Sequence, residues 1–481
     1  MSDETVPAIK PSLPEEQPMI PQPLVELHGW GRAAGTMSHL AQIDSVADAV
    51  SALRKSDSRG VVPRGLGRSY GDAAQNAGGT ALDLTKMNRI LSLDASSDPA
   101  TVTVQAGVSL DSLMRALLPF GLWVPVLPGT RQVTIGGAIA ADVHGKNHHT
   151  QGSFGNHVRS LDLLMADGKM RTVTPDGDTR TLFWATVGGM GLTGAILRAT
   201  VALQRTESAY FTVDTHRAAN IDDLMQQMSQ GDENYTYSVA WFDAVTRGRH
   251  MGRGVLTRGN KAQLVELPTK LRRDPLKFVA PSLGTLPEVF PNRMINKATA
   301  KAFSTAWYLK APKDRTGELQ NITQFFHPLD MVAEWNRVYG PNGFLQYQFV
   351  VPFEEAETFR RCLEMIVNSG HLSCLNVLKR FGPGNPSPLS FPMPGWTLTV
   401  DLPIEHGLDR LCDALDNEVV GAGGRVYLAK DSRLSAVMFR RMYPRLDDFL
   451  AVRREVDPTG IFNSDLARRL ELSKPTTGGT T

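Results

Sequence analysis

Three glycine-rich segments carry the residue types best suited to holding a phosphorylated ligand. The first, residues 63–72 (PRGLGRSYGD), spaces its glycines so that successive backbone N–H groups can point into one concavity, which suits a pyrophosphate. The second, residues 127–138, repeats this chemistry, and the third lies within residues 183–196. Two such loops after two strand pairs favour a long ligand held along its length. Tight turns in a compact sheet protein are the alternative for each loop taken alone.

The first segment is not the fingerprint of a dinucleotide-binding Rossmann fold. Its spacing is GxGxxxG, and residues 73–79 after it contain glycine and amide side chains instead of a helical pattern. The fingerprint requires a strand before the glycines and a helix after them. The sequence therefore predicts a phosphate cradle of another type.

Histidine and lysine supply the candidate acid–base groups. His144 stands in a run of glycine and polar residues, not on an apolar face, which favours a functional role over a place in the core. His148 and His149 have no carboxylate or cysteine beside them at a ligand spacing, so we predict no metal site. Lys430 follows the apolar run 426–429, at the expected end of a strand, where an ordinary exposed lysine is the alternative interpretation.

Short strands and a few helices must position these segments. Apolar spacing predicts helices at residues 46–53 and 110–117, and a hairpin around Asp167-Gly168. The region up to about residue 208 therefore has the pattern of an α+β domain. Beyond it, a second domain that contains a sheet is predicted by strand-like runs at residues 235–242, 343–351 and 396–402.

Length and composition fit a globular protein with several domains. The chain has 481 residues, and about 150 residues per domain predicts two or three domains. Its 42% of hydrophobic residues is too high for a disordered chain. The 51 Lys and Arg against 49 Asp and Glu leave a net charge of +2, which argues against a dedicated nucleic-acid binder. Three cysteines, none in a CxxC pair, argue against a disulfide framework.

The ends and one internal segment depart from this pattern. Residues 1–26 are acidic and rich in proline, without the basic start and apolar run of a signal peptide, and with residues 473–481 they are predicted to be disordered. No apolar run is long enough to predict a transmembrane helix. Residues 266–313 have a local charge of +6 and little periodicity, so we expect a mobile loop or lid there.

In their order along the chain, the glycine loops resemble the FAD domain of vanillyl-alcohol-oxidase-type flavoproteins. The resemblance covers residues 38–205 and includes the RGxG loop, the VTIGG loop, the His144-Gly145 pair and the ADG hairpin. It implies a two-domain α+β flavoprotein with a discontinuous FAD domain and an antiparallel-sheet substrate domain. It also implies that FAD is bound by Arg64, Gly65, Leu66, Gly67, Arg68, Ser69, Tyr70, Gly71, Asp72, Gly129, Thr130, Thr134, Ile135, Gly136, Gly137, His144, Gly145, Lys146, Asn147, Ile196 and Tyr427. Many members carry a flavin-linking histidine where this chain has Arg68, so we expect non-covalent FAD.

Four motifs narrow the resemblance to the decaprenylphosphoryl-β-D-ribose 2-oxidases of actinobacteria, over residues 27–472. They are HGKNHH at 144–149, FWATVGG at 183–189, QYQF at 346–349 and AKDSR at 429–433. The resemblance implies oxidation of the ribose 2-hydroxyl of a polyprenyl-phosphate sugar to a ketone, which an NAD(P)H-dependent partner reductase converts to the arabinose epimer for cell-wall arabinan. It makes Lys430, His144 and Gln348 the catalytic candidates. The residues that it places around the substrate are Lys146, Trp241, Gln346, Gln348, Lys379, Thr399 and Lys430.

Two substrate-side positions depart from that pattern, and the proton acceptor stays open. Thr399 and Phe326 stand where mycobacterial members carry cysteine and tyrosine, so a reagent that depends on that thiol should form no covalent adduct. A lysine needs a lowered pKa to act as a base near neutrality. Lys430 is therefore either the base or a cation that stabilises the reduced flavin, and in the second case His144 is the alternative base.

These inferences divide the chain into an FAD domain of residues 27–208 and 425–472 and a substrate domain of residues 209–424. The nearest alternative is a sugar-lactone or alditol oxidase on the same fold, and the alternative of another class is a non-enzymatic binder of a nucleotide or lipid phosphate. The absence of a signal peptide predicts a cytoplasmic protein or one at the periphery of the inner membrane, while the resemblance keeps the periplasmic face open. Segment 266–313 is either a solvated loop or a lipid contact, made by Leu271, Phe278, Leu283, Leu286 and Phe290 among the cations.

Overall fold

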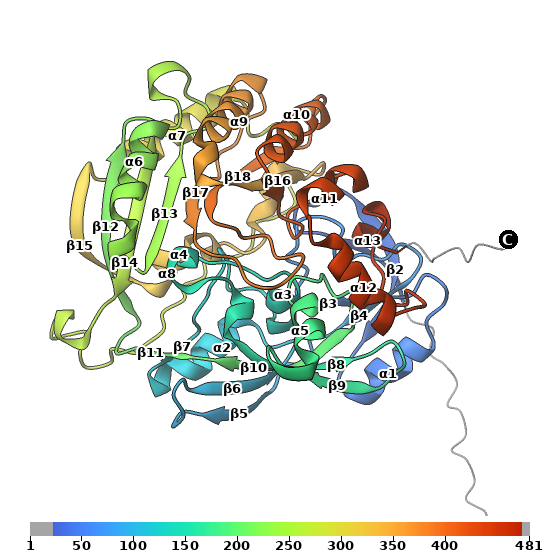
Figure 1. Cartoon of the computed structure of the whole chain (residues 1–481). Coiled ribbons are helices and arrows are strands. Elements are labelled where there is room, and N and C mark those ends of the chain that lie inside the picture. Colours follow the sequence, from blue (N-terminus) through green and yellow to red (C-terminus); the bar gives the residue numbers. More distant parts are fainter. Residues whose placement is uncertain (1–22, 474–481) are drawn as a thin grey trace, which may run out of the picture.

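The computed structural model describes residues 23–473 (Figure 1). Most of the two ends predicted to be disordered, residues 1–26 and 473–481, lies outside the described residues. The prediction is wrong for residues 24–26, which belong to strand β1 (Leu24–His28). This edge strand pairs along its whole length with β2 (Gly35–Gln42), and this pairing makes residues 24–26 a strand despite the prolines before them.

Two sheets build the half of the molecule that contains the glycine loops. A four-stranded sheet has the order β1-β2-β4-β3, and a five-stranded sheet has the order β5-β6-β10-β8-β9. Their further strands are β3 (Val61–Arg64), β4 (Thr80–Asp83), β5 (Ile90–Asp94), β6 (Thr101–Gln105), β8 (Val158–Leu164), β9 (Met170–Val173) and β10 (Ala195–Ala202). A short ladder joins β7 (Leu122–Trp123) to β11 (Gln204–Arg205).

Two helices in this half confirm the predictions made from apolar spacing. The first two predicted helices are α1 (Val46–Arg54) and α2 (Leu110–Leu117), which bury their apolar residues against the core. Asp167-Gly168 lies in the turn of the predicted hairpin, between β8 and β9. The other helices of this half are α3 (Ile135–Ala140), α4 (His148–Gln151) and α5 (Arg180–Thr186).

An eight-stranded antiparallel sheet builds the other half, in the order β15-β12-β14-β13-β17-β18-β16-β19. The three predicted strands are confirmed as β13 (Tyr237–Phe242), β16 (Phe344–Val351) and β18 (Gly395–Pro403). The rest are β12 (Tyr210–Ala218), β14 (Gly254–Lys261), β15 (Asp314–Asn321), β17 (Asn376–Phe381) and β19 (Arg425–Val426). Helices α9 (Ala356–Ser369) and α10 (Leu408–Gly421) cover β16 on one side, and α6 (Ile221–Gly231) packs on β12 and β14. The fold is α+β, as predicted.

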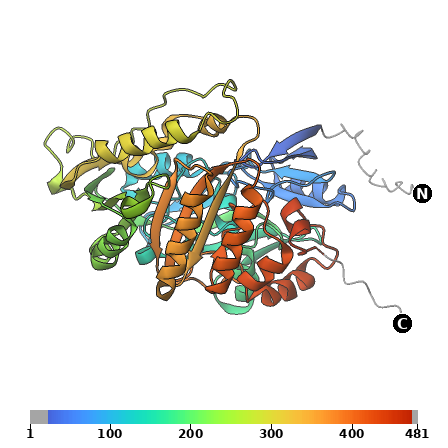
Figure 2. The ribbon, with the colours of Figure 1, turned by 90° about the horizontal axis from the view of Figure 1, so that it is seen from above.

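The C-terminal segment returns to the first half (Figures 1 and 2). Strand β19 still pairs with β16, so residues 425–426 belong to the large sheet although the sequence placed them with the FAD domain. After it come α11 (Ala436–Met442), α12 (Leu446–Val456) and α13 (Asp465–Arg469). Phe462 then bridges Val61 of β3, which ties the end of the chain to the first sheet.

Segment 266–313 is not a loop throughout, which corrects the prediction. It contains helix α7 (Lys297–Lys310), capped by Asn296, on the outside of the molecule (Figure 2). The helix is rich in good helix formers but buries only the small residues Ala300 and Ser304, so it has little apolar periodicity to detect. A short helix, α8 (Ile322–Phe326), follows β15. Within residues 23–473, no helix has the length and apolar character needed to cross a membrane.

Candidate active site

The predicted cofactor cradle forms where the glycine loops meet the C-terminal segment. Gly65 packs so tightly on the Thr134 side chain, and Gly71 on the Asp431 carbonyl, that a Cβ at either glycine would lie well within 3.0 Å of its neighbour. Gly67 has a φ of +64°, which an L side chain rarely adopts. The Tyr70 N–H donates to the Ala429 carbonyl at 2.8 Å. Segments from three distant parts of the sequence are therefore held in direct contact.

The side chains of the first loop fasten it to the protein. Arg64 donates to the carbonyl oxygens of His28 and Ala74 at 2.9 and 2.8 Å. The Arg68 guanidinium lies 4.1 Å from the ring centre of Trp30, and it donates to the Leu66 carbonyl. Because these side chains face the protein, the backbone is the part of the loop left to meet a ligand.

The second loop offers the open side of the cradle. Thr134 caps α3 by accepting a hydrogen bond from Gly137, and Ile135 and Gly136 donate to Val108 and Ala106. Gly129 has nothing within 4 Å of the position where its Cβ would stand. This combination of tightly apposed glycines and an open glycine fits an FAD pyrophosphate, which must approach the backbone closely.

Several residues predicted for the cofactor have protein partners in the structure. Both oxygens of Asp72 accept hydrogen bonds from Arg469 at 2.8 Å, which ties α13 to the first loop. Asn147 donates to the Pro125 carbonyl, Thr130 accepts from the Gln132 N–H, and Ile196 lies buried in β10. Ser69 accepts from the Trp30 N–H through its carbonyl oxygen, and Gly145 packs closely on the Leu127 backbone. Through these contacts, the residues form part of the wall of the cradle.

The predicted substrate residues share one face of the large sheet. Across the ladder of β16 and β18, Gln346 pairs with Asp401 and Gln348 with Thr399. Lys379 of β17 pairs with Thr397 of β18. Because side chains alternate along a strand, these residues point to the same side, while Leu345, Tyr347 and Phe349 point to the helices. The two-residue period of the strands thus gathers the polar groups that the sequence left scattered.

His144 lies against this face with partners at both ring nitrogens. Gln348 Nε2 is 3.0 Å from His144 Nε2, and Lys379 Nζ is 3.4 Å from His144 Nδ1. Burial, with the charges of Lys379, His148 and Lys430, lowers the pKa of His144 well below its usual value. The imidazole is therefore neutral at physiological pH and can accept a proton. The structure brings the three catalytic candidates together, since Gln348 contacts the His144 ring directly and Lys430 is near enough for its charge to lower the His144 pKa.

Three half-buried lysines, Lys146, Lys379 and Lys430, surround this point. Burial lowers the pKa of Lys146 to about 7, with a further contribution from Lys379, and lowers that of Lys379 to about 8. Lys146 donates to the Phe325 carbonyl, and its Nζ lies 5.6 Å from the ring centre of Phe326. Lys430 Nζ lies 3.7 Å from the ring centre of Tyr70. Burial lowers the pKa of Lys430 to about 7, although Asp401 raises it; Lys379 lowers it further.

The sequence interpretation missed Asp401 and Tyr339. Asp401 is fully buried, and it accepts hydrogen bonds from Gln346 and from the Tyr339 hydroxyl. Tyr339 lies in the short helix η8 (Trp335–Tyr339), stacked on Phe344 with ring centres 4.0 Å apart. A carboxylate at the end of the apolar run WTLTV was the available signal, because a charge in a buried strand needs a partner.

Trp241 and Thr399 lie farther along the same sheet. Trp241 in β13 pairs with Val377, donates to the Cys374 carbonyl at 3.1 Å, and has its ring 6.5 Å from that of Trp307 in α7. Thr399, between Gln348 and Val377 on the neighbouring strands, is 8% exposed. Trp241 thus joins the polar face to α7.

Two of the histidines considered for a metal have structural partners. His148 Nδ1 accepts from the Gly382 N–H at 3.2 Å, and His149 Nε2 lies 2.9 Å from the Tyr235 carbonyl. Among the residues that the structure describes, no group of three or more His, Cys, Asp or Glu side chains is placed to hold a metal ion.

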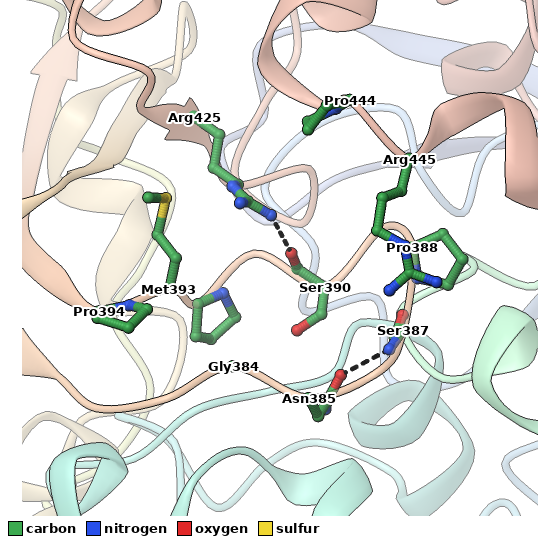
Figure 3. Close-up of a pocket in the computed structure, with 11 residues that line it drawn as sticks. Gly384, Asn385, Ser387, Pro388, Ser390, Met393, Pro394, Arg425, Pro444 and Arg445 are labelled. Carbon is green, nitrogen blue, oxygen red and sulfur yellow. Dashed lines mark hydrogen bonds between the residues drawn. The ribbon is translucent and has the colours of Figure 1, made fainter.

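A separate cleft of about 310 Å³ opens on the other side of the segment between β17 and β18 (Figure 3). Arg425 and Arg445 reach this cleft, and Arg425 donates to the Ser390 carbonyl at 3.0 Å. None of the predicted site residues lines it. Phe391, next in sequence to Ser390, stacks on Tyr427 at 4.7 Å, so this segment separates the cleft from the candidate site.

Comparisons with known proteins agree with this geometry. The model of the FAD binding domain matches residues 38–174, which include both glycine loops, and the model of D-arabinono-1,4-lactone oxidase matches residues 404–470. The predicted cofactor, FAD, is thereby confirmed.

Individual relatives cover more of the chain. It is 55% identical over 450 residues to decaprenylphosphoryl-beta-D-ribose oxidase of Mycolicibacterium smegmatis, with 93% of this chain and 97% of that protein covered. It is 39% identical over 373 residues to an uncharacterized protein of Streptomyces coelicolor, with 76% and 100% covered. It is also 30% identical over 167 residues to D-lactate dehydrogenase of Archaeoglobus fulgidus, with 33% and 37% covered.

Proposed function

Because the chain belongs to the decaprenylphosphoryl-β-D-ribose oxidase family, we propose that it oxidises the ribose 2-hydroxyl of decaprenylphosphoryl-β-D-ribose to a ketone. Family membership also makes the chain an FAD-dependent oxidoreductase. The observation that carries the proposal is the convergence of His144, Gln348 and three half-buried lysines on one polar face beside the FAD cradle.

The glycine loops would hold FAD without a covalent bond. Arg68 stands at the position of the flavin-linking histidine, and its guanidinium is packed on Trp30. FAD supplies the acceptor for the hydride that leaves C2 when the alcohol becomes a ketone. The protein must then remove the hydroxyl proton and stabilise the negative charge that develops.

We assign these two tasks to different side chains. His144 is buried and neutral, and it would accept the hydroxyl proton once the substrate hydroxyl replaces Gln348 or Lys379 at one ring nitrogen, while the other partner holds the ring in place. Lys430, whose Nζ lies over the Tyr70 ring, would in its ammonium form stabilise the developing negative charge, and Asp401 favours that form. We assign Lys146 to the substrate phosphate or hydroxyl groups; in the structure its Nζ donates to the Phe325 carbonyl and lies 4.5 Å from the Phe325 ring centre.

Product analysis tests the reaction directly. The purified protein is incubated with decaprenylphosphoryl-β-D-ribose, and the product is trapped with sodium borodeuteride. We expect deuterium at C2 of the sugar, because reduction of a 2-ketone adds deuterium there. Deuterium at another carbon, or its absence under conditions in which the flavin is reduced, contradicts the proposal.

A sugar-lactone or alditol oxidase is the second candidate, favoured by the match of residues 404–470 to D-arabinono-1,4-lactone oxidase. That match covers the C-terminal return, which builds the cradle wall and includes Lys430. Oxidation of free alditols or aldonolactones, with no oxidation of the polyprenyl-phosphate sugar, would favour this candidate.

A 2-ketone product requires a second enzyme to complete the epimerisation. We propose an NAD(P)H-dependent reductase as this partner, because hydride addition to the opposite face of the ketone gives the arabinose epimer. Mixing the two enzymes with substrate and NAD(P)H should yield decaprenylphosphoryl-arabinose, whereas the oxidase alone should yield only the ketone.

Contact with an anionic membrane surface would bring the enzyme to a polyprenyl substrate. Leu283 and Val289 are more than 70% exposed, and Phe303 and Trp307 of α7 stack on each other at the surface. Lys297, Lys301 and Lys310 lie on the same helix. Phe278 is not part of this surface, since Arg115 covers its ring.

Binding to anionic vesicles should be weaker for the double variant Leu283→Asp/Trp307→Ser than for the wild type. The variant Phe120→Asp, which changes an exposed residue of the first half, is the control and should bind like the wild type. Equal binding by the wild type and both variants contradicts the contact.

A further inference from the structure

Asp401 lies at the centre of a buried polar network that the proposed reaction does not explain. Its side chain has no solvent exposure, and it accepts hydrogen bonds from the Gln346 amide and, at 3.3 Å, from the Tyr339 hydroxyl. Its backbone N–H donates to the Ser373 hydroxyl at 3.0 Å. A buried carboxylate is costly unless its charge is balanced, so the identity of its cationic partner matters.

The network leads from Asp401 to Lys430. The Gln346 amide that donates to Asp401 also donates to the Tyr70 hydroxyl at 3.1 Å. The Tyr70 ring in turn lies under Lys430, with Nζ 3.7 Å from the ring centre. The two charges also act on each other, because Asp401 raises the pKa of Lys430 and Lys430 lowers that of Asp401, each against the effect of burial.

The other two lysines of the site have neutral neighbours. Lys146 donates to a carbonyl oxygen, and Lys379 lies beside the neutral His144 ring. Burial lowers the pKa of both, and Lys379 disfavours the charged forms of Lys146 and Lys430. Three ammonium groups in one buried site repel one another, and a single buried carboxylate can compensate only one of them.

Building on the proposed function, we propose that Asp401 is a positioning residue that favours the ammonium form of Lys430 and, through Gln346 and Tyr70, holds that ammonium at the reacting centre. Lys430 is then the electrostatic anchor, and the role of base stays with His144. The titratable groups that face this pair are Tyr70 of the first glycine loop, His144, Tyr339 of η8, Cys374 before β17 and Lys379 of β17.

The protonation state of Lys430 can be measured without turnover. FAD-loaded wild type and Asp401→Asn are treated with acetic anhydride between pH 6 and 10, and acetylation of each lysine is followed by mass spectrometry. Only the neutral amine reacts, so we extend the series to pH 5, well below the Lys430 pKa of about 7, and expect the rate at Lys430 there to rise about tenfold in Asp401→Asn, the effect of roughly one pKa unit. The rate at the exposed Lys169 should not change. An unchanged or lower rate at Lys430 overturns the proposal.

A second variant covers the case in which Asp401→Asn does not fold. Tyr339→Phe removes one hydrogen bond that stabilises the Asp401 carboxylate, so the Lys430 rate should rise in the same direction by a smaller factor, about two- to threefold. No change at Lys430 in this folded variant also overturns the proposal.

The pH profile of turnover separates charge assignment from a merely structural role. Activity that needs the Lys430 ammonium falls as the pH rises through the pKa of that group. In Asp401→Asn we expect this fall about one pH unit lower, whereas a structural role would reduce kcat equally at every pH. If no sugar is oxidised by any variant, the proposed function fails, while the acetylation rates still decide the role of Asp401.

Discussion

The FAD cradle and the lysine face of the large sheet are two neighbouring regions built in opposite ways. In the cradle, Arg64, Asp72 and other side chains bind the protein, and glycine backbone is left to meet the cofactor. On the sheet, the backbone is used in the ladder, and the side chains of Gln348 and Lys379 face the site. The cradle therefore binds the cofactor through the close fit of its backbone, whereas the lysine face acts through charged side chains whose pKa values are shifted by burial.

This difference makes the two regions sensitive to different changes. At Gly71 of the cradle, a single added methyl group collides with the backbone carbonyl of Asp431. On the lysine face, a change of equal size has little steric effect, but a change of charge alters both catalysis and the pH dependence of stability.

Gly71→Ala should have the largest effect. The new Cβ would collide with the Asp431 carbonyl oxygen, and overpacking of this kind costs about 3 kcal/mol or more where backbone must shift. We expect loss of bound FAD together with a lower melting temperature, measured by flavin absorbance and calorimetry. Gly129→Ala is the matched control, because its Cβ meets no protein atom; it should fold normally and weaken FAD binding alone. Normal FAD content and stability in Gly71→Ala would contradict the packing argument.

Lys430→Met tests the lysine face with little change in volume. Loss of the ammonium should slow flavin reduction by substrate about 10²- to 10³-fold, the usual effect of removing one preorganised charge or donor, while FAD stays bound. Stopped-flow absorbance under anaerobic conditions measures the rate. A wild-type rate with full FAD content would exclude a central role for Lys430.

Lys379→Met should stabilise the folded protein at neutral pH. Burial lowers the pKa of Lys379 to about 8, so between that pH and about 10.4 the unfolded state binds more protons and wild-type stability rises with pH. The variant removes this penalty, so its advantage, up to about 3 kcal/mol, should be greatest below pH 8 and vanish by about pH 10.5. Urea unfolding of the FAD-loaded wild type and variant, once below pH 8 and once at about pH 10.5, measures the difference in their free energies of unfolding. An equal advantage at both would show that Lys379 is not held in a desolvated site.

Thr399→Cys should have the smallest effect on turnover, within about twofold, since a thiol replaces a hydroxyl in an 8% exposed side chain. Its chemical effect should be clear. A thiol-directed reagent activated by turnover should leave no adduct at position 399 of the wild type and one adduct in the variant. An adduct at wild-type Thr399, seen by peptide mass spectrometry, would contradict this expectation.

The same contrast explains what could be predicted from the sequence. The cradle loops, α1, α2 and the hairpin are local patterns, so glycine spacing and apolar periodicity predicted them. The pairing of Gln346 with Asp401 joins residues 55 apart along the chain. A single sequence does not show which residues of two distant strands lie opposite each other, so this pairing could not be predicted. Lys430 looked like an ordinary strand-end lysine for the same reason.

The errors have physical causes of the same kind. Helix α7 buries only small residues, so apolar spacing did not detect it. Residues 24–26 follow a proline-rich stretch, and only their pairing with β2 makes them a strand. Strand β19 is two residues long, which is too short for any alternation to show.

The most direct test of the account is anaerobic mixing of the FAD-loaded protein with decaprenylphosphoryl-β-D-ribose while the absorbance of the oxidised flavin is followed. We predict bleaching to the reduced flavin at a rate that saturates with substrate and that Lys430→Met lowers about 10²- to 10³-fold. A flavin that stays oxidised with this substrate but is bleached by free alditols or aldonolactones would contradict the account.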